Sequence, residues 1–398
     1  MAQRFDAIVV GGGPGGATAA RLLAQQGLQT LVLDAQAFPR PKVCGGGVTA
    51  RTAALLADLD LRPVIDDTTY RFVLGHGDYR VAVTADRPLV FQVRRHRFDH
   101  LLLQAAQAAG AQVRTGEPVT DVGEDDDAVT VVTKEGRYRA PFLVAADGAK
   151  GLTARRLGAA PLRRWCGAVE WEYPVTQEEH GRWAGSLEFA FGSPRDGYAW
   201  VFPKKEHWSV GVCTLRAASS PLPQLLQEYM GRHGLDQRRP GLLRSAWPLA
   251  VSPGGAPAVL HTRRAVFVGD AAGLTDPFSG EGIYYAVASA RHAAEVLARQ
   301  SPAGPRLTDY AQRLQKGLLP ELRWSWRLAR TFYPVGGWML RSLVRADRTA
   351  FAEMLAALAR GDADYRRLAR QVPGVILRGG RSGRPRPGEP AVEVMVYA

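Results

Sequence analysis

Cysteine is scarce in this chain of 398 residues: only Cys44, Cys166 and Cys213 occur, and they lie far apart. They form neither a CxxC pair nor an even-numbered framework, which argues against a structural zinc site and a disulfide-rich scaffold. The eight histidines show no metal-ligand spacing. No G-x-S-x-G motif or Ser/His/Asp set occurs in a suitable context, so hydrolase chemistry has no support. We therefore expect reduced thiols and no metal site.

Long hydrophobic runs are also absent. No stretch of eighteen apolar residues occurs, so we expect no transmembrane helix. The first residues, MAQRFDAIVV, contain no basic segment and no cleavage-type small residues after an apolar stretch. Because this beginning runs directly into a strand pattern, we expect a mature cytoplasmic protein.

Lysine is rare in a chain that is otherwise basic. Only six of the 51 basic residues are lysine, and the arginines are spread over nearly the whole chain, whose net charge is +13. No zinc finger, RNA-recognition signature or basic repeat is present, so we expect no nucleic-acid partner. A basic surface would instead suit anionic lipid head groups. The hydrophobic fraction of 46% is that of a globular protein, and the length suits two domains or one large one.

The N-terminal segment contains a dinucleotide-binding pattern. The apolar run FDAIVV (5–10) predicts a buried parallel strand. It is followed by G-x-G-x-x-G from Gly11 to Gly16, and then by a helical pattern that ends at Gly27. A second strand pattern, LQTLVLD, closes with Asp34. This strand–turn–helix–strand order predicts one half of a nucleotide-binding fold.

Each residue of this pattern has a physical task. Gly11 permits a sharp turn, Gly13 lets the backbone approach a pyrophosphate, and Gly16 lets the helix pack closely on the strand. The helix N-terminus offers unpaired N–H groups and the positive end of its dipole to phosphates. Asp34 can accept hydrogen bonds from ribose hydroxyls. The residues expected to hold an adenine dinucleotide here are Gly11, Gly13, Gly15, Gly16 and Asp34.

Two later segments favour FAD over NAD. The first, FLVAADGAKG (142–151), predicts an apolar strand that ends at Asp147. The second, 263–297, contains a strand that reaches Asp270, where a carboxylate can bind the ribityl hydroxyls that FAD has and NAD lacks. No second G-x-G-x-x-G unit occurs, so an NAD(P)H reductant would have no dinucleotide domain of its own.

The Pro/Gly-rich loop after this strand predicts contacts with the flavin. A helix expected to begin near Glu281 and Gly282 would aim its positive N-terminus at the N1–C2=O region of the flavin. We expect Pro277 to line the isoalloxazine edge. The residues of this segment expected near the cofactor are Gly269, Asp270, Pro277, Gly280, Gly282 and Ile283.

Together these segments resemble the FAD-dependent family that includes aromatic hydroxylases, flavin halogenases and geranylgeranyl reductases, all related to the glutathione-reductase-type FAD fold. The stretch VRRHRFDHLL (93–102) resembles a helix start of that family. The resemblance implies that Arg95 lies near the phosphates or ribose of the cofactor. It also implies that the backbone of Val119 contacts the adenine.

Two further motifs separate the sub-families. The stretch RPKVCGGGV (40–48) is similar to the P-x-x-C-G-G pattern of geranylgeranyl reductases, including chlorophyll-pathway and archaeal-lipid enzymes. The stretch GYAWVFP (197–203) resembles their Y-x-W-x-F-P motif. Halogenases carry a different variant there and a catalytic lysine, whereas Lys42 stands in another setting. The chain is thus identified as a member of the geranylgeranyl reductase family.

The resemblance implies roles for these two motifs. Cys44, with Gly45 and Gly47, would form a loop against the flavin. Cys44 is then either a proton donor or a small buried residue that lines the site. The residues expected to bind substrate are Tyr198, Trp200 and Phe202. Their alternation puts them on one face of a strand, either as an aromatic wall over the flavin and an apolar chain or in ordinary sheet packing.

We expect an α/β fold: a glutathione-reductase-type Rossmann FAD-binding domain, an inserted antiparallel β-sheet substrate domain and a C-terminal helical cap. The amphipathic helices from about residue 305 suit a cap over a lipid site, contact with a membrane surface, or packing on the core. The expected boundaries are 1–60, 95–160 and 255–300 for the FAD domain, 61–94 and 161–254 for the substrate domain, 301–375 for the helical region, and 376–398 for a poorly ordered tail.

The function implied is that of an FAD-dependent reductase. Reduced flavin would deliver a hydride to a C=C bond of an isoprenoid chain carried by a lipid, quinone, pigment or diphosphate. NAD(P)H or ferredoxin would reduce the flavin. One alternative is an FAD-dependent monooxygenase that hydroxylates or epoxidises an apolar substrate, because the fold supports both chemistries. Another is a membrane-bound flavoprotein that acts as a binding or electron-carrier module.

Overall fold

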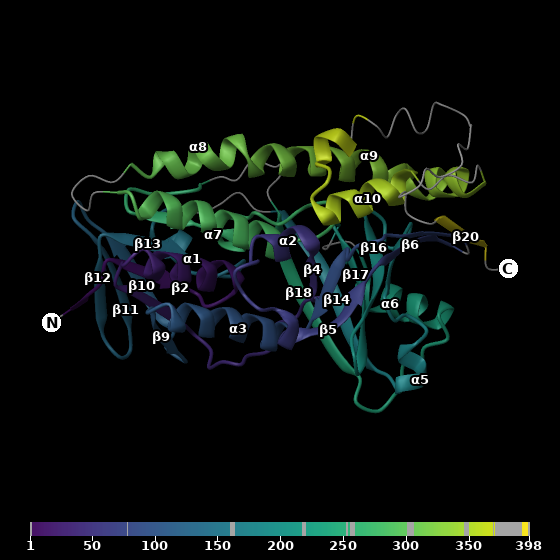
Figure 1. Cartoon of the computed structure of the whole chain (residues 1–398), viewed down its shortest axis with the longest axis horizontal. Coiled ribbons are helices and arrows are strands. Elements are labelled where there is room, and N and C mark those ends of the chain that lie inside the picture. The colour runs from purple at the N-terminus through teal and green to yellow at the C-terminus, as the bar shows by residue number, and fades with distance from the viewer. Residues whose placement is uncertain are drawn as a thin grey trace.

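The computed structural model describes residues 2–77, 79–159, 164–216, 220–251, 254, 259–300, 306–345, 350–368, 370 and 392–396. Within these ranges the chain forms four β-sheets with helices packed on them (Figure 1). No helix in the same ranges is both long and apolar enough to cross a bilayer.

A five-stranded parallel sheet lies in the left half of the view in Figure 1, in the order β19-β13-β2-β3-β9. Its strands are β2 (Ala7–Val10), β3 (Thr30–Asp34), β9 (Gln112–Thr115), β13 (Phe142–Ala145) and β19 (Ala265–Phe267). Every strand except β9 is buried throughout, as parallel strands covered on both faces must be.

Helices cover one face of this sheet and a small sheet covers the other. The helices are α1 (Pro14–Gln25), α3 (Arg95–Ala108), α7 (Ile283–Leu297) and α8 (Thr308–Lys316), and α1 packs between α3 and α7. The small sheet consists of β1 (Gln3–Arg4), β10 (Val119–Glu124), β11 (Val129–Thr133) and β12 (Arg137–Ala140). Its apolar side packs on Ile8 and Leu31 of the parallel sheet.

An eight-stranded sheet has the order β18-β14-β17-β16-β15-β6-β7-β20. Its strands are β6 (Arg71–His76), β7 (Tyr79–Thr84), β14 (Arg164–Pro174), β15 (Ser186–Phe191), β16 (Gly197–Pro203), β17 (His207–Thr214), β18 (Leu243–Val251) and β20 (Val392–Val396). All neighbouring pairs are antiparallel except β6 and β15, which are parallel. We expected an antiparallel sheet, and the pair β6 and β15 departs from that expectation. A long connection joins these two strands, so no hairpin imposes the antiparallel direction.

The two faces of this sheet pack against different helices. Ala199 and Val201 of β16 contact α6 (Leu222–Arg232), whereas Tyr198 and Trp200 belong to the cluster that includes α9 (Leu318–Arg345) and α10 (Ala350–Arg360). This alternation follows from the two-residue period of a strand. The aromatic residues of β16 thus lie on the side where α9 and α10 cross the sheet (Figure 1).

Short elements connect these layers. They are β4 (Gly47–Thr49), β5 (Ile65–Thr69) and β8 (Val90–Val93), which form a three-stranded sheet, and α2 (Ala50–Ala54), α4 (Thr153–Arg156), α5 (Gln177–His180), η1 (Arg62–Val64) and η4 (Gly269–Ala272). The strand β20 lies inside the segment that we expected to be poorly ordered. Its pairing with β7 was not indicated by the Gly/Pro/Arg-rich composition before it.

Candidate active site

A cavity of about 710 Å³ lies between the parallel sheet and the eight-stranded sheet. The carboxyl ends of β2, β3, β13 and β19 open into it, as they do in ligand sites of open α/β sheets. Strands β14 to β18 and the helix α10 supply the remaining walls. Residues from the whole chain therefore meet at one place.

The glycine turn after β2 is held by close backbone contacts. Gly11 has a φ of +102°, and a Cβ atom there would lie 2.3 Å from the carbonyl oxygen of Ala146. A Cβ atom on Gly16 would lie 1.8 Å from the carbonyl oxygen of Gly11. Gly11 lines the cavity, whereas Gly16 does not, because it lies in the contact between helix and strand.

The N-terminus of α1 opens into the cavity. Its N-cap residue is Gly13, which provides no side-chain hydrogen bond, and Pro14 occupies the first turn. Gly13, Pro14 and Gly15 all line the cavity. Helix N-termini leave backbone N–H groups without intrahelical partners, so a phosphate at this position would receive them.

Asp34 closes β3 and organises the glycine turn. Its Oδ2 accepts a hydrogen bond from the backbone N–H of Gly12 at 2.7 Å, and its Oδ1 accepts one from Gln36 at 2.9 Å. The side chain lines the cavity, as does Val119 at the start of β10. The structure thus brings together the residues expected around the adenosine part of a cofactor.

A buried carboxylate that the sequence analysis did not single out orients two arginines at the cavity. Arg95 forms a bidentate pair with Asp99, with Nε–Oδ1 and Nη2–Oδ2 distances of 2.8 and 2.9 Å. Arg40 Nη1 lies 3.5 Å from the same carboxylate. Burial opposes the charged guanidinium, but the Asp99 charge and the Cys44 sulfur raise the pKa of Arg95 above its usual value. The i,i+4 spacing of Arg95 and Asp99 was the available signal.

The second half of the cofactor pattern lies across the cavity. Asp270, in η4, accepts a hydrogen bond from Thr275 Oγ1 at 2.9 Å, and Asp147, just after β13, accepts one from the backbone N–H of Thr153 at 2.8 Å. The helix α7 begins at Ile283, and its N-cap Gly282 provides no side-chain bond. The cavity-lining residues of this half are Asp147, Gly269, Asp270, Gly280, Gly282 and Ile283.

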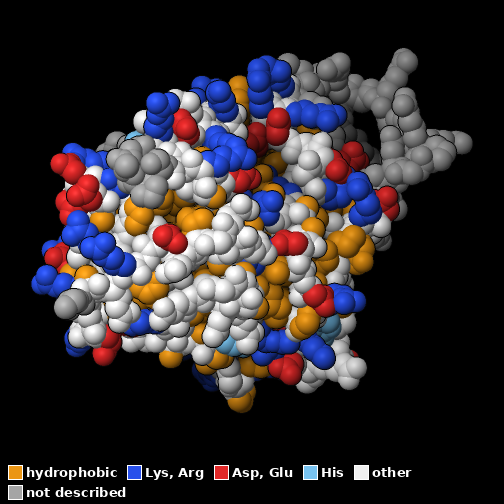
Figure 2. All heavy atoms as spheres, turned by 60° about the vertical axis from the view of Figure 1, so that its left-hand side comes forward, with side chains coloured by type: hydrophobic (Ala, Val, Ile, Leu, Met, Phe, Trp, Pro, Cys, Tyr) orange, Lys and Arg blue, Asp and Glu red, His pale blue; other side chains and the backbone are white. Residues whose placement is uncertain are grey.

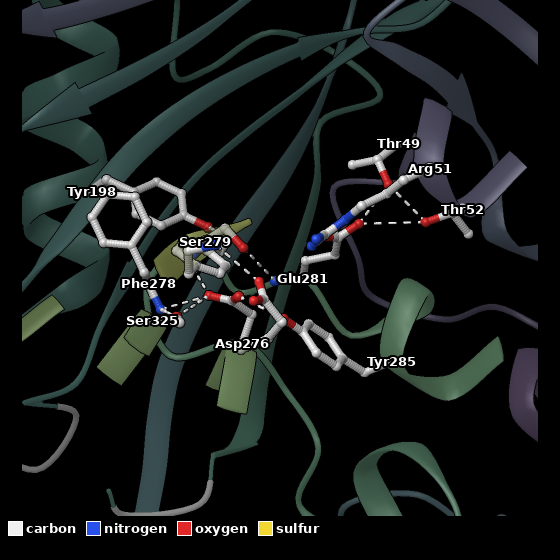
Figure 3. Close-up of polar contacts among 12 residues, drawn as sticks. Thr49, Arg51, Thr52, Tyr198, Asp276, Phe278, Ser279, Glu281, Tyr285 and Ser325 are labelled. Atoms are coloured by element: carbon white, nitrogen blue, oxygen red, sulfur yellow. Dashed lines mark hydrogen bonds and ion pairs between the residues drawn. The ribbon is translucent and has the colours of Figure 1, made fainter. Parts of the chain in front are cut away.

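The loop before α7 is tied to its surroundings by one buried carboxylate (Figure 3). Asp276 Oδ1 accepts hydrogen bonds from the backbone N–H groups of Phe278 and Ser279, both at 2.8 Å, and from Ser325 Oγ at 2.7 Å. Tyr285 donates to its other oxygen at 3.3 Å. Burial raises the pKa of Asp276 above its usual value.

These bonds determine which residues of the Pro277 loop reach the cavity. Pro277 is not among the residues that line the cavity; Phe278 and Ser279 line it instead. The reason is the turn that Asp276 caps, since it brings the two residues after the proline to the cavity surface. At the end of the loop, Glu281 accepts a hydrogen bond from Thr49 Oγ1 at 2.6 Å.

The glycines after Cys44 are required by their neighbours. A Cβ atom on Gly45 would lie 2.9 Å from the ring of Phe202, and Gly46, with a φ of +72°, would place one 2.2 Å from the carbonyl oxygen of Val93. Cys44 and Gly45 line the cavity together with Gly47. The Cys44 sulfur accepts a hydrogen bond from the backbone N–H of Gly46 at 3.4 Å and is also hydrogen-bonded to Arg95.

The three aromatic residues of β16 form one wall of the cavity. Ring centroids of Tyr198 and Trp200 lie 6.0 Å apart, those of Trp200 and Phe202 6.2 Å apart, and Phe189 packs edge-on against Tyr198. Further apolar residues line the cavity. They are Phe72, Val90, Leu187, Phe191, Cys213, Leu249, Phe278, Leu355, Leu358 and Ala359.

A group of cations at the cavity was also missed. Lys42 Nζ lies 3.7 Å from the ring centroid of Trp247, and Lys150 Nζ lies 4.6 Å from it. Burial, together with the nearby Arg95 charge, lowers the pKa of Lys42 to about 8. These residues come from three separate elements, so their proximity has no local sequence signal.

A buried chain of hydrogen-bonded polar side chains is the second group that the sequence analysis did not predict. Trp200 Nε1 donates to Ser209 Oγ at 3.0 Å, and Ser209 donates to Glu170 Oε1 at 2.6 Å. The nearby backbone amide of Cys44 favours the ionised form of Glu170, whereas burial raises its pKa. Lys204 is buried nearby and donates to the carbonyl oxygen of Gly45.

The residues around the cavity fit FAD. Two helix N-termini without side-chain caps open into it, and the carboxylates of Asp34 and Asp270 stand at the ends of strands that border it. Glycines, rather than bulky side chains, form the loops where the backbone must come close to a planar ligand. This combination suits a dinucleotide with a diphosphate and two sugar-like chains.

Comparison with known proteins agrees with this chemistry. Residues 4–183 match the protein family described as FAD binding domain. The chain is 30% identical to the menaquinone reductase of Mycolicibacterium smegmatis over 78% of this chain and 79% of that protein. It is 31% identical to the geranylgeranyl diphosphate reductase of Rhodobacter capsulatus over 74% of this chain and 75% of the relative.

A solved structure shares the fold over nearly the whole chain. It is a geranylgeranyl bacteriochlorophyll reductase-like protein from Thermoplasma acidophilum, with a TM-score of 0.76 and 20% identity, and the similarity covers 94% of this chain and all of that one. The molecule is a mixed α/β FAD-binding protein. With these relatives, the chain belongs to the geranylgeranyl reductase family of FAD-dependent oxidoreductases.

Proposed function

We propose that the protein saturates carbon–carbon double bonds of an isoprenoid chain by hydride transfer from reduced FAD. The observation that carries this proposal is the continuous apolar wall of the cavity, which starts at the Cys44–Gly47 loop and runs along β16 to α10. Such a wall matches an extended hydrocarbon chain. The names of relatives support a lipid, a quinone, a pigment or a diphosphate as the proposed carrier of that chain.

The cavity provides the two conditions that this reaction needs most. An isolated alkene accepts a hydride poorly, so it must be held in a near-attack position and kept away from water. Phe189, Tyr198, Trp200 and Phe202 would hold the chain on one side, and Leu355 and Leu358 of α10 would cover it on the other. FAD, once reduced, supplies the hydride.

The proposed roles of the cofactor-facing residues follow from their positions. Gly13 and Gly15 at the N-terminus of α1 would receive the diphosphate, and Asp34 the ribose. Asp270 would bind the ribityl chain, and the N-terminus of α7 at Ile283 would face the flavin. In this proposal residues 1–60, 95–160 and 255–300 form the FAD domain, 61–94 and 161–254 the substrate domain, and α9 and α10 the helical cap.

We further propose that NAD(P)H or ferredoxin reduces the flavin and that the helical cap touches a membrane. Arg323, Arg327 and Arg330 are exposed on α9 at spacings of four and three residues, so they share one side of the helix. Basic side chains gather along the upper edge of the molecule in Figure 2, where the helices lie at the top of Figure 1. Such a surface suits anionic head groups.

The test is anaerobic. The flavin of the purified protein is reduced chemically, geranylgeranyl lipids or menaquinone are added, and reoxidation of the flavin is followed while products are weighed by mass spectrometry. Products heavier by pairs of hydrogen atoms are expected. A flavin that stays reduced until air enters, and then gives an oxygenated product, would replace this proposal with a monooxygenase. No product under either condition would favour an electron carrier.

A further inference from the structure

Glu170 presents a carboxyl group to the cavity from the middle of β14. Its side chain is 4% exposed and lines the cavity. The hydroxyl of Ser209 donates a hydrogen bond to it at 2.6 Å, and the nearby backbone amide of Cys44 favours its ionised form. Among the described residues, no arginine, lysine or histidine forms an ion pair with it.

Asp276 is also buried among neutral donors, but it does not line the cavity. Glu188, Glu281 and Asp34 differ from Glu170 in their partners. Glu188, on β15, is fully buried but lies 2.6 Å from the guanidinium Nε of Arg80. Glu281, at the cavity, pairs with Arg51, and Asp34 accepts two backbone hydrogen bonds. Burial raises the pKa of Glu170 above its usual value. Glu170 is therefore an acid that retains its proton closer to neutral pH than an exposed carboxyl group does.

The other proton-bearing groups of the cavity wall are less suited to donate a proton to the substrate. The hydroxyl proton of Tyr198 is engaged with the carbonyl oxygen of Ser279, and burial raises the pKa of Tyr198 well above its usual value. The sulfur of Cys44 accepts hydrogen bonds from Gly46 and Arg95. A carboxylic acid is also intrinsically a stronger acid than a thiol or a phenol.

We propose, on the basis of the function proposed above, that the carboxylic acid of Glu170 donates the proton that accompanies hydride transfer to the double bond. The π bond of the alkene breaks, one carbon takes the hydride of reduced FAD, and its neighbour takes the proton of Glu170. The alkene is reduced and the flavin is oxidised. The O–H bond of Glu170 breaks and leaves a carboxylate.

The surroundings of Glu170 accommodate that carboxylate. The hydroxyl of Ser209 on β17 donates a hydrogen bond to it, and the nearby backbone amide of Cys44 favours the ionised form. Lys204, after β16, contributes a positive charge, whereas Glu172 on the same strand contributes a negative one. Water restores the proton once the saturated product leaves the cavity. Glu170 would thus keep its proton before transfer, and its surroundings would stabilise the carboxylate that remains afterwards.

The kinetic test compares Glu170→Gln with Glu172→Gln in the FAD-loaded protein. Glu172 lies two residues away on β14, but its side chain is 49% exposed and does not line the cavity. General acids contribute typically about 10²- to 10⁴-fold to a rate. We expect anaerobic reoxidation of the reduced flavin by the alkene to slow by about 100-fold or more in E170Q, with E170D in between. In E172Q the rate should stay within about threefold of wild type, because solvent screens the charge of the exposed Glu172.

A rate for E170Q within about threefold of wild type would overturn the proposal. FAD content and thermal unfolding of each variant identify a folding defect, and E170D then serves as the variant that keeps an acid. A loss of rate in C44S, with none in E170Q, would assign the proton to Cys44. A wild-type protein that saturates no isoprenoid would instead remove the proposed function itself.

A second readout does not depend on turnover. The infrared spectrum of the oxidised, FAD-loaded protein at neutral pH should contain a carbonyl-stretching band of a protonated carboxylic acid that is absent from E170Q and present in E172Q. The difference between wild type and E170Q isolates Glu170 from other buried acids. Identical spectra in this region would show that Glu170 is ionised, and the proposal would fail even if the protein were active.

Discussion

The hydroxyl of Tyr198 donates a hydrogen bond to the backbone carbonyl of Ser279 (Figure 3). Tyr198 belongs to the aromatic wall of β16, and Ser279 to the loop that leads into α7. The bond joins the part of the cavity proposed to hold the substrate to the part proposed to face the flavin. Asp276 and Glu281 hold the same loop through further hydrogen bonds.

Removing this hydrogen bond should lower the stability of the folded protein measurably. Tyr198→Phe leaves the ring in place but deprives the Ser279 carbonyl of its donor. We expect the free energy of unfolding to fall by about 1–2 kcal/mol, the usual cost of an unsatisfied buried partner. Denaturant titration of the FAD-loaded protein measures it. Tyr70→Phe is the control, since Tyr70 is 40% exposed, and a loss of similar size there would show that the Tyr198 bond has no special role.

Trp200 lies flat against the backbone of Gly211 on the neighbouring strand. A Cβ atom on Gly211 would lie 2.1 Å from Cζ2 of the indole, so Gly211→Ala must displace the ring and break its bond to Ser209. We expect the KM for the isoprenoid to rise by about tenfold, which corresponds to about 1.4 kcal/mol of lost binding, while FAD content stays unchanged. Gly231→Ala is the control, because a Cβ atom there meets no atom within 4 Å. An unchanged KM would show that Trp200 does not contact the substrate.

The nucleotide half-site was predictable because its signal is local. Gly11, Gly13 and Gly16 follow a buried strand, and Asp34 closes the next one. One short segment of the sequence therefore contains the whole nucleotide-binding pattern. The structure places Gly11, Gly13 and Asp34 at the cavity. The hydrogen bond from Gly12 to Asp34 adds a structural task that the pattern alone did not suggest.

The parts that were missed depend on contacts between distant segments. Glu170 and Ser209 lie 39 positions apart and meet only because β14 pairs with β17. The contact predicted between Pro277 and the flavin stays a prediction. The loop around Pro277 is held by Asp276, whose partner Ser325 is 49 positions away. The hydrophobic periodicity of a single segment does not predict such contacts, because they depend on the order of strands in the sheet and on how helices pack.

The close packing at Gly16 allows a direct test of the half-site. Gly16→Ala would place a Cβ atom 1.8 Å from the carbonyl oxygen of Gly11, which cannot be relieved by moving a side chain. We expect a loss of stability of about 3 kcal/mol or more and a matching loss of bound FAD. Thermal unfolding and the ratio of flavin to protein absorbance measure the two effects. Gly123→Ala, where a Cβ atom meets nothing within 4 Å, should leave both near wild type.

Lys42 should make stability depend on pH in the alkaline range. Burial, with the Arg95 charge, lowers the pKa of Lys42 to about 8 in the folded chain, against 10.5 when unfolded. Between these values the unfolded state binds more protons, so the free energy of unfolding contributed by Lys42 rises with pH. Below pH 8 both states are protonated and the cost of burying the charge is present in full.

Lys42→Met removes this group while keeping a side chain of similar length. We expect FAD-free wild type to gain stability relative to K42M as the pH rises from 8 to 10.5, with a constant difference below pH 8. Urea titrations at a series of pH values measure it. Lys134→Met is the control, because Lys134 is exposed and its variant should follow the wild-type curve. A K42M difference that does not change above pH 8 would mean that Lys42 carries its charge in the folded protein at an ordinary pKa, held by groups that compensate its burial beside Trp247.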